Sequence, residues 1–314
     1  GALSNGLSKG FAVLSSDAGH SGFTPFFGLD PQARLDYGYN AVGQLTPMAK
    51  NLIKTVYGKA PDRSYLVGCS NGGRHAMVAA SRYADQYDGI VAGNPGFNLP
   101  KAAVAQLWGV QQYAGLATTT VGTTGLPDIS TAFTPAELNM VSTKILDKCD
   151  ALDGATDGLV GDLKACQTAF NVSRDVPTCS GARDGSCLTY AQKTVLTDVH
   201  AGARNSAGTA IYTSFPYDAG INGTSSSGWR SWKFSNALTR DPGAVAFIFT
   251  APPVANTSTF SDLSYALNFN MDVDAPKIFG TNGTYTVAPM TFMTPPDPTN
   301  LTTLKNRGAK LIVY

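Results

Sequence analysis

The stretch Ser64–His75 (SYLVGCSNGGRH) constrains the fold of this chain more than any other segment. The apolar run at 65–67 predicts a short buried strand, and residues 73–83 predict a helix. A Gly-x-Ser-x-Gly pattern centred on Ser70 lies between them. A strand, a sharp turn and a helix in this order are the setting of a nucleophile elbow, in which a strained turn exposes the serine hydroxyl.

The glycines of this pattern have a steric role in the predicted turn. Side chains at these positions would collide with the neighbouring strand and helix, so we expect Gly68 and Gly72 to be required. The alternative interpretation is a Gly-rich turn that only joins a strand to a helix. The strand and helix on either side of the pattern favour the nucleophile elbow.

Further predicted strands and helices alternate along the chain on both sides of this pattern. The sequence predicts strands at 11–16 and 89–93, a helix at 43–58, a helix at 300–307 and a buried strand at 310–314. This succession indicates a parallel sheet with right-handed crossovers. The middle of the chain is mixed, with helical pieces at 102–115, 135–147 and 189–201. We therefore predict an α/β core, residues 1–96 and 298–314, with a large lid domain, residues 97–297, inserted between two core strands.

Composition limits the partners and the compartment. The formal net charge is +1, so no nucleic-acid partner is implied. No apolar run reaches about 18 residues, so we expect no membrane span. Four of the five cysteines lie close together in a Gly- and Asp-rich stretch, Cys149–Cys187. This density favours disulfide bonds and a secreted or periplasmic protein over a zinc site, because the chain has no Cys-x-x-Cys.

A nucleophilic serine needs a base and a carboxylate that orients the base. The chain has three histidines. His75 lies on the helix leading away from the turn and cannot easily reach back to the serine hydroxyl. His20 could face the site from a loop, although a bond to nearby backbone explains it equally well. We expect His200 on the surface.

The remaining catalytic groups are therefore expected outside the chain. With this order of elements, the acid and the histidine follow a later strand, beyond Tyr314. One oxyanion donor should be the backbone N–H of Asn71. We expect the second donor in a loop before Gly1.

A second group of polar residues forms an acidic loop at 149–162. Its carboxylates, Asp150, Asp153 and Asp157, alternate with glycines, a composition that suits a hard cation with backbone carbonyls completing the shell. We predict calcium; the alternative is an Asp/Gly turn with capping aspartates. A disulfide between Cys149 and Cys166 would close this loop.

An aromatic segment at 228–234 contains two tryptophans, Trp229 and Trp232. They could form the wall of a pocket for an aromatic substrate. Packing in the core is the alternative.

Together these residues resemble the tannase and feruloyl esterase family. The resemblance extends through nearly the whole chain and rests on residues 16–20, 68–74, 87–93, 149–157, 188–193 and 228–233. It implies an α/β-hydrolase fold with a large lid, Ser70 as the nucleophile and the Asn71 amide as an oxyanion donor. It also implies that the chain is a fragment, lacking an N-terminal part and the C-terminal Asp/His segment.

The resemblance further implies a structural Ca²⁺ site and three disulfide positions. The ligands would be the side chains of Asp150, Asp153 and Asp157 and the carbonyls of Ala155 and Leu159. The disulfides would be Cys149–Cys166 and Cys179–Cys187, with Cys69 bonded to a cysteine outside this chain.

We therefore expect a serine carboxylic-ester hydrolase that acts on small aromatic-acid esters, such as ferulates or gallates, through an acyl-enzyme on Ser70. Two alternatives remain open at this point. One is a non-catalytic, calcium-stabilised binding domain. The other is a peptidase or transacylase with the same nucleophile elbow.

Overall fold

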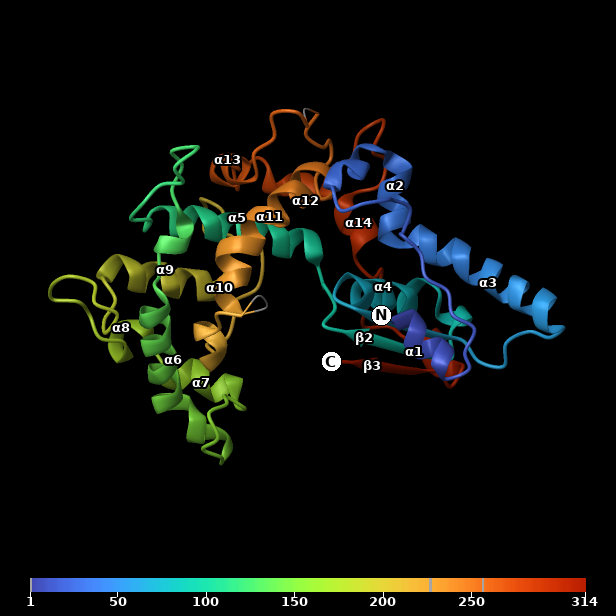
Figure 1. The fold of residues 1–314 in the computed structure, drawn as a ribbon, viewed down its shortest axis with the longest axis horizontal. Helices are drawn as coiled ribbons and strands as arrows, with labels where there is room; N and C mark the ends of the chain where they lie inside the picture. The colour runs from blue at the N-terminus through green and yellow to red at the C-terminus, as the bar shows by residue number, and fades with distance from the viewer. Residues whose placement is uncertain (1, 226–227, 256) are drawn as a thin grey trace. The chain divides into compact units, whose positions relative to one another are not determined.

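The computed structural model describes residues 2–225, 228–255 and 257–314, and the chain divides into two units (Figure 1). The first unit comprises residues 1–100, 246–257 and 277–314, and the second comprises residues 101–245 and 258–276. The second unit begins close to the predicted position 97. Its end differs from the prediction, because residues 246–257 and 277–297 belong to the first unit.

The buried side chain of Arg34 explains part of this difference. Its guanidinium donates hydrogen bonds to the carbonyls of Ile248 and Thr250, the latter at 2.5 Å. An arginine buried without a carboxylate needs such acceptors. The segment at 246–257 is thereby tied to the first unit, which the residue pattern did not reveal.

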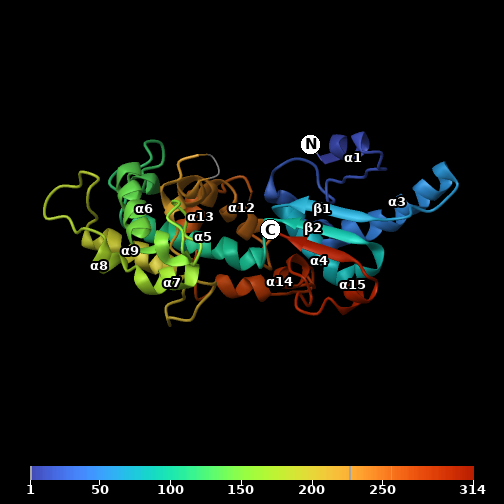
Figure 2. The ribbon, with the colours of Figure 1, turned by 90° about the horizontal axis from the view of Figure 1, so that it is seen from below.

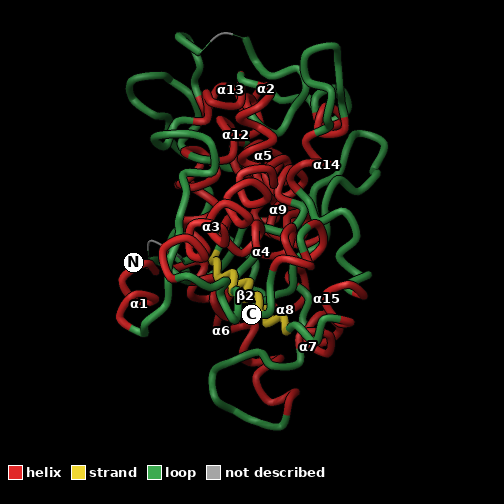
Figure 3. The backbone as a smooth tube through the Cα atoms, turned by 90° about the vertical axis from the view of Figure 1, so that its right-hand side faces the viewer, coloured by secondary structure: helices red, strands yellow, loops and turns green. Residues whose placement is uncertain are grey.

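The first unit is built on a parallel sheet of three strands, in the order β1 (Tyr65–Cys69), β2 (Gly89–Gly93) and β3 (Lys310–Val313). Leu66 lies opposite Ile90, which lies opposite Leu311. Figure 3 shows the strands in yellow among helices in red and loops in green. The strands predicted at 65–67, 89–93 and 310–314 are confirmed as β1, β2 and β3, and so is their parallel pairing.

The helical elements of the first unit agree with the strongest predicted ones. The predicted helix at 43–58 is α3, which ends at Gly58 in the left-handed conformation (φ 71°). The bounds are α1 (Ala2–Ser8), η1 (Pro25–Leu29), α2 (Pro31–Leu35), η2 (Asp36–Asn40), α3 (Ala41–Tyr57), α4 (Asn71–Arg82), η3 (Ala84–Gln86), α14 (Pro289–Met293) and α15 (Thr302–Asn306).

One face of the sheet is covered and the other is open. Ile90 and Ala92 of β2 pack with apolar residues of α4 and with Leu304 of α15 (Figure 2). The opposite face exposes Tyr65, Val67 and Ile312 to 55, 65 and 58 %. The prediction that β1 and β3 are buried is therefore wrong for one face, because no layer within the described residues covers it.

The predicted strand at 11–16 is also wrong. These residues have no regular secondary structure, and Phe11 and Leu14 are about half exposed. A strand needs a neighbour for its backbone hydrogen bonds. Among the described residues, no strand pairs with this segment.

The second unit is helical, and capping explains where its long helices begin. Thr134 and Glu137 form a capping box at the start of α6, and Thr189 and Gln192 form another at the start of α9. Its elements are α5 (Leu99–Ala114), which begins in the first unit, η4 (Ile129–Thr131), α6 (Pro135–Cys149), η5 (Asp150–Asp153), α7 (Leu163–Ala169), α8 (Val172–Asp175), α9 (Tyr190–Ala201), η6 (Ala219–Asn222), α10 (Trp229–Ser231), η7 (Trp232–Asn236), α11 (Ala237–Thr239), α12 (Asp241–Phe247) and α13 (Asp262–Asn268), with η8 (Ala275–Phe279) at the boundary between the units.

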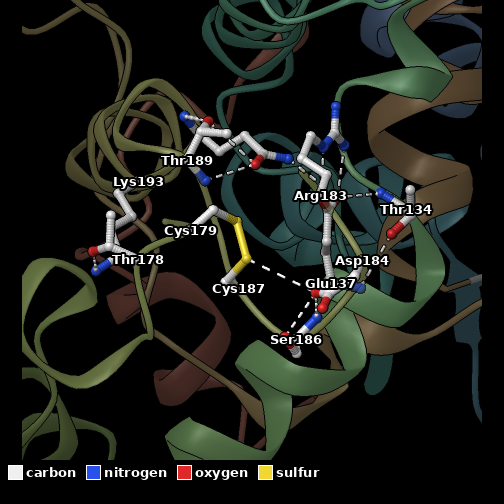
Figure 4. Close-up of a disulfide and its surroundings, with 11 residues drawn as sticks. Thr134, Glu137, Thr178, Cys179, Arg183, Asp184, Ser186, Cys187, Thr189 and Lys193 are labelled. Atoms are coloured by element: carbon white, nitrogen blue, oxygen red, sulfur yellow. Dashed lines mark hydrogen bonds and ion pairs between the residues drawn. A yellow bond between two sulfur atoms is a disulfide. The ribbon is translucent and has the colours of Figure 1, made fainter. Parts of the chain in front are cut away.

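Two disulfides stabilise the second unit, Cys149–Cys166 and Cys179–Cys187, as the resemblance implies. Figure 4 shows the second disulfide at the base of a loop whose Arg183 donates to the carboxylate of Glu137, with both nitrogen–oxygen distances 2.7 Å. Burial favours the neutral form of Glu137, but the hydrogen bonds from Arg183, Thr134 and Gln192 outweigh it and hold the pKa of Glu137 below its ordinary value.

None of the helices in the described part of the chain combines the length and the apolar character needed to span a membrane.

Candidate active site

Ser70 lies in the sharp turn between β1 and α4, as predicted. Its backbone has φ 59° and ψ −118°, a combination that costs a non-glycine residue about 1–3 kcal/mol. Its N–H donates to the carbonyl of Gly93 at 2.9 Å, and its carbonyl accepts from Arg74 N at 3.0 Å. These bonds hold the strained backbone between the end of β2 and the first turn of α4.

The side chain of Ser70 is exposed and makes no capping bond to α4, although it occupies the N-cap position. A serine at an N-cap ordinarily accepts a hydrogen bond from the helix backbone. In this strained turn the Ser70 side chain forms no such bond. The arrangement leaves the hydroxyl available for reaction with a substrate.

The steric role of the glycines is confirmed at one position and wrong at another. A Cβ on Gly68 would lie 2.2 Å from the carbonyl oxygen of Gly72. A Cβ on Gly72 would meet no atom within 4 Å, so Gly72 is not required for space. Gly73 is the second constrained position, because its Cβ would lie 2.3 Å from the carbonyl oxygen of Gly93. The first turn of α4 rotates residue 73, and not residue 72, toward β2.

Asn71 is the first residue of α4, where a backbone N–H has no acceptor within the helix. The positive end of the helix dipole adds to this N–H, which suits the oxyanion of an acyl-transfer intermediate. The side chain of Asn71 is fixed by Arg74, whose Nε donates to Asn71 Oδ1 at 2.8 Å. The geometry is compatible with the predicted role of Asn71 as an oxyanion donor.

Arg74 is a functional neighbour that was not predicted from the sequence. It is 1 % exposed and donates to the carbonyls of Tyr37 (2.7 Å) and Gly38 (2.8 Å) in η2. Burial lowers the pKa of Arg74 to about 10, which keeps it cationic at neutral pH. A charged residue two positions after the Gly-x-Ser-x-Gly pattern, followed in α4 by the apolar run at 76–80, was the available signal.

Neither histidine of the first unit forms a hydrogen bond to Ser70 in the described structure. His75 Nε2 lies 2.9 Å from an Arg74 guanidinium nitrogen, and burial together with Arg74 and His20 lowers the pKa of His75 to about 3. His20 stacks on Phe27, with ring centroids 3.9 Å apart. As predicted, His75 does not turn back to the serine hydroxyl. His20 contacts the rings of Phe27 and Tyr37, an environment that was not predicted for it.

His200 belongs to the second unit, and the prediction that it lies on the surface is wrong. It is 6 % exposed, stacks on Tyr217 and shares a 2.8 Å hydrogen bond between Nδ1 and the carbonyl of Leu196. Burial lowers the pKa of His200 to about 4. Its helical spacing in α9 directs it inward.

The acidic loop at 150–159 contains the predicted calcium ligands Asp150, Asp153, Ala155, Asp157 and Leu159. Asp150 Oδ1 accepts from the amides of Asp157 and Gly158, both at 3.0 Å, and Asp153 Oδ1 accepts from Ala155 N at 2.9 Å. Among the described residues, no three Asp, Glu, His or Cys side chains come close enough together to hold a metal ion. These hydrogen bonds to the carboxylates order the loop backbone, and the calcium site remains a prediction.

Cys69, the last residue of β1, is free and exposed in the described structure. It directly precedes Ser70, so any bond to it would also restrain the strained turn. The partner outside this chain remains a prediction.

Trp229 and Trp232 both line a cavity of about 420 Å³ in the second unit. Trp229 also packs edge-on against Tyr113 and Phe234, which agrees with the core-packing alternative, and its contact with a substrate remains a prediction. Trp232 is 43 % exposed. The polar members of this cavity, Gln106, His200, Asp218 and Lys233, were not predicted from the sequence.

The family model and the relatives that match this chain indicate the same family. Residues 2–314 match the family model described as tannase and feruloyl esterase. The chain is 37 % identical over 344 aligned positions to mono(2-hydroxyethyl) terephthalate hydrolase of Piscinibacter sakaiensis, covering 100 % of the chain and 57 % of that relative. It is 32 % identical over 204 positions to a probable feruloyl esterase B-1 of Neosartorya fischeri, covering 65 % of the chain and 36 % of the relative.

The structure resembles that of feruloyl esterase B from Aspergillus oryzae, with a TM-score of 0.67 and 23 % identity over 98 % of this chain and 55 % of that one. This similarity shows the α/β-hydrolase fold. The chain spans about half the length of the relatives it matches.

Proposed function

Because the chain belongs to the tannase and feruloyl esterase family, we propose that it carries the nucleophile of a serine hydrolase that cleaves esters of aromatic acids. The observation that carries this proposal is the geometry of Ser70. Its hydroxyl is exposed on a positive-φ turn, free of a capping bond, beside the N-terminus of α4. The named relatives, a terephthalate-ester hydrolase and a probable feruloyl esterase, support aromatic esters as the substrate class.

The reaction proposed for Ser70 has two acyl-transfer steps. Ser70 Oγ forms a bond to the ester carbonyl carbon and gives its proton to a base, and the negative charge moves to the carbonyl oxygen. The carbon–oxygen bond to the alcohol then breaks, the alcohol takes the proton, and an acyl-enzyme remains. Water repeats the sequence and releases the acid.

The oxyanion of both steps is proposed to accept a hydrogen bond from the Asn71 backbone N–H. Removing one such donor typically costs about 100- to 1000-fold in kcat. The base is proposed to be a histidine outside residues 1–314, since Arg74 and Phe27 hold His75 and His20. The orienting acid and a second oxyanion donor are proposed to come from outside as well.

The second unit is proposed to supply the binding site for the aromatic ring, through Trp229 and Trp232 of the cavity. Aromatic walls bury a flat ring and provide edge-to-face contacts. Its two disulfides support a secreted or periplasmic protein, because cytosolic thiols are kept reduced.

The test is hydrolysis of a panel of feruloyl, galloyl and terephthalate esters by the full-length protein. Ser70→Ala should abolish turnover and acyl-enzyme formation, whereas Ser64→Ala, at a position whose described bonds use its backbone, should retain both. Unchanged turnover in Ser70→Ala would reject the assignment. Amide substrates and added acceptor alcohols in the same panel identify a peptidase or a transacylase.

A further inference from the structure

The cavity of the second unit combines aromatic walls with a single cationic side chain among its lining residues. Its volume of about 420 Å³ falls within the range of small-molecule sites. Phe215, Trp229 and Trp232 supply flat apolar surface, and Lys233 supplies the cation. All of the cavity's lining residues among those described belong to the second unit.

Lys233 is not neutralised by the groups that surround it. Its Nζ donates to Gln106 Oε1 at 3.2 Å and lies 4.7 Å from the ring centre of Phe215. Among the described residues, no carboxylate lies within ion-pair distance of Nζ. An ammonium has three donors, and one bond to a neutral amide leaves donor capacity for an anion. Burial lowers the pKa of Lys233 to about 8, with Asp241 acting in the opposite direction.

Two acidic residues lie near the cavity. Asp218, on the exposed rim, uses Oδ1 to cap η6 through a 2.7 Å bond from Gly220 N. Burial raises the pKa of Asp241 to about 7, against the opposing effects of Lys233 and Arg240. Within the described residues, neither carboxylate forms an ion pair with Lys233.

His200 adds a polar feature to the same cavity. With the pKa of His200 lowered to about 4, the imidazole is neutral at pH 7 and adds no charge that competes for an anion. Lys233 is therefore the group in the lining that can attract a carboxylate.

We propose that this cavity binds a small aromatic carboxylate, with the ring against Trp229, Trp232 and Phe215 and the carboxylate on Lys233 Nζ beside Gln106. The proposal deepens the proposed function, on which it rests for the choice of an aromatic acid. It makes Lys233 a specificity-determining residue that favours substrates or products with a free carboxylate. An ammonium–carboxylate hydrogen bond is worth about 1.5–3 kcal/mol, or about 10- to 100-fold in affinity.

The experiment measures binding of benzoate, 4-hydroxybenzoate and terephthalate to the full-length protein by calorimetry. The neutral isostere benzamide is the matched ligand control. The protein carries Ser70→Ala, so that turnover does not enter the measurement and the esterase assignment can fail or hold independently.

Lys233→Met should weaken binding of the carboxylates about 10- to 100-fold and leave benzamide binding unchanged, while Lys233→Arg should retain carboxylate binding. Trp232→Ala should weaken acids and amide alike. Thermal denaturation of each variant verifies that it is folded; if Lys233→Met does not fold, the benzoate-to-benzamide affinity ratio of the Ser70→Ala protein decides. Equal affinity for benzoate and benzamide, or unchanged benzoate affinity in folded Lys233→Met, would overturn the proposal.

Discussion

Two adjacent glycines provide a matched test of the turn that holds Ser70. Both Gly72 and Gly73 lie in the first turn of α4, so alanine gains the same helix propensity at either position, at most about 1 kcal/mol. The two positions differ in the room that is available for a side chain. A Cβ at residue 72 meets nothing within 4 Å, whereas a Cβ at residue 73 lies 2.3 Å from the Gly93 carbonyl oxygen and 3.0 Å from Pro95 Cα.

The magnitude follows from these distances. A carbon–oxygen contact ordinarily begins at about 3.3 Å, so the new Cβ at residue 73 and the Gly93 oxygen must separate by about 1 Å. Both neighbours are backbone atoms at the end of β2 and cannot rotate away. Overpacking of this kind costs about 1–3 kcal/mol. We expect Gly73→Ala to destabilise by about 2–3 kcal/mol and Gly72→Ala to stabilise by about 0.5 kcal/mol.

The substitution at Gly73 should also lower activity, because the displaced carbonyl of Gly93 accepts the hydrogen bond from Ser70 N–H. A shift of about 1 Å in a catalytic group can cost about 100-fold in rate. Urea denaturation followed by circular dichroism gives the two stabilities, and ester hydrolysis by the full-length protein gives kcat. Two variants with stabilities within about 0.5 kcal/mol of each other, the size of ordinary surface effects, would refute the steric reasoning.

Two further predictions concern the second unit. Arg183→Met should destabilise the protein by about 3 kcal/mol at pH 7, because it leaves the buried carboxylate of Glu137 unpaired. The folded-state pKa of Glu137 is depressed, so the stability that the pair contributes is present above the unfolded pKa of about 4.3 and is lost as the pH falls through the folded-state pKa. The difference in stability between wild type and variant should therefore shrink below about pH 4. A difference that is independent of pH would contradict this prediction. If Ca²⁺ binds the loop at 150–159, an ion at a hundredfold excess over Kd stabilises the fold by about 2.7 kcal/mol, and EDTA should remove this contribution. At about 2.1 cal/mol/K of unfolding entropy per residue, the melting temperature of the 314 residues should then fall by about 4 °C. An unchanged melting temperature would show that the amide bonds to Asp150 and Asp153 order the loop without an ion.

Elements with local signals could be predicted from the sequence. The strands around Ser70 and the helices α3, α6 and α9 follow from periodicity and capping residues, which act within a few positions. Burial of the strands could not be predicted, because Leu66 and Val67 are equally apolar, yet only Leu66 faces the layer that α4 covers. Which face is covered depends on elements that are distant in the sequence.

In the candidate site, too, features that depend on local sequence could be predicted, and features that depend on distant elements could not. The Gly-x-Ser-x-Gly pattern identified Ser70 and the constraint at Gly68, because both depend on the turn itself. Which of the next two glycines is sterically constrained, Gly73 and not Gly72, depends on the rotation of α4 relative to β2. The hydrogen bond from Arg34 to the carbonyl of Thr250 joins segments that are more than two hundred residues apart in the sequence, so no local pattern could reveal it.

The histidines show why distance along the chain is a weak guide to a catalytic base. His75 is close to Ser70 in sequence, but Arg74 occupies its Nε2 and, with burial, lowers the pKa of His75 to about 3. A base is most effective when its pKa lies near the working pH, and a pKa of about 3 makes the proton transfer unfavourable by several pKa units. The same guanidinium fixes Asn71, so the arrangement that holds the proposed oxyanion donor also disables the neighbouring imidazole. If Ser70 is the nucleophile, as proposed, its proton therefore goes to a base other than His75.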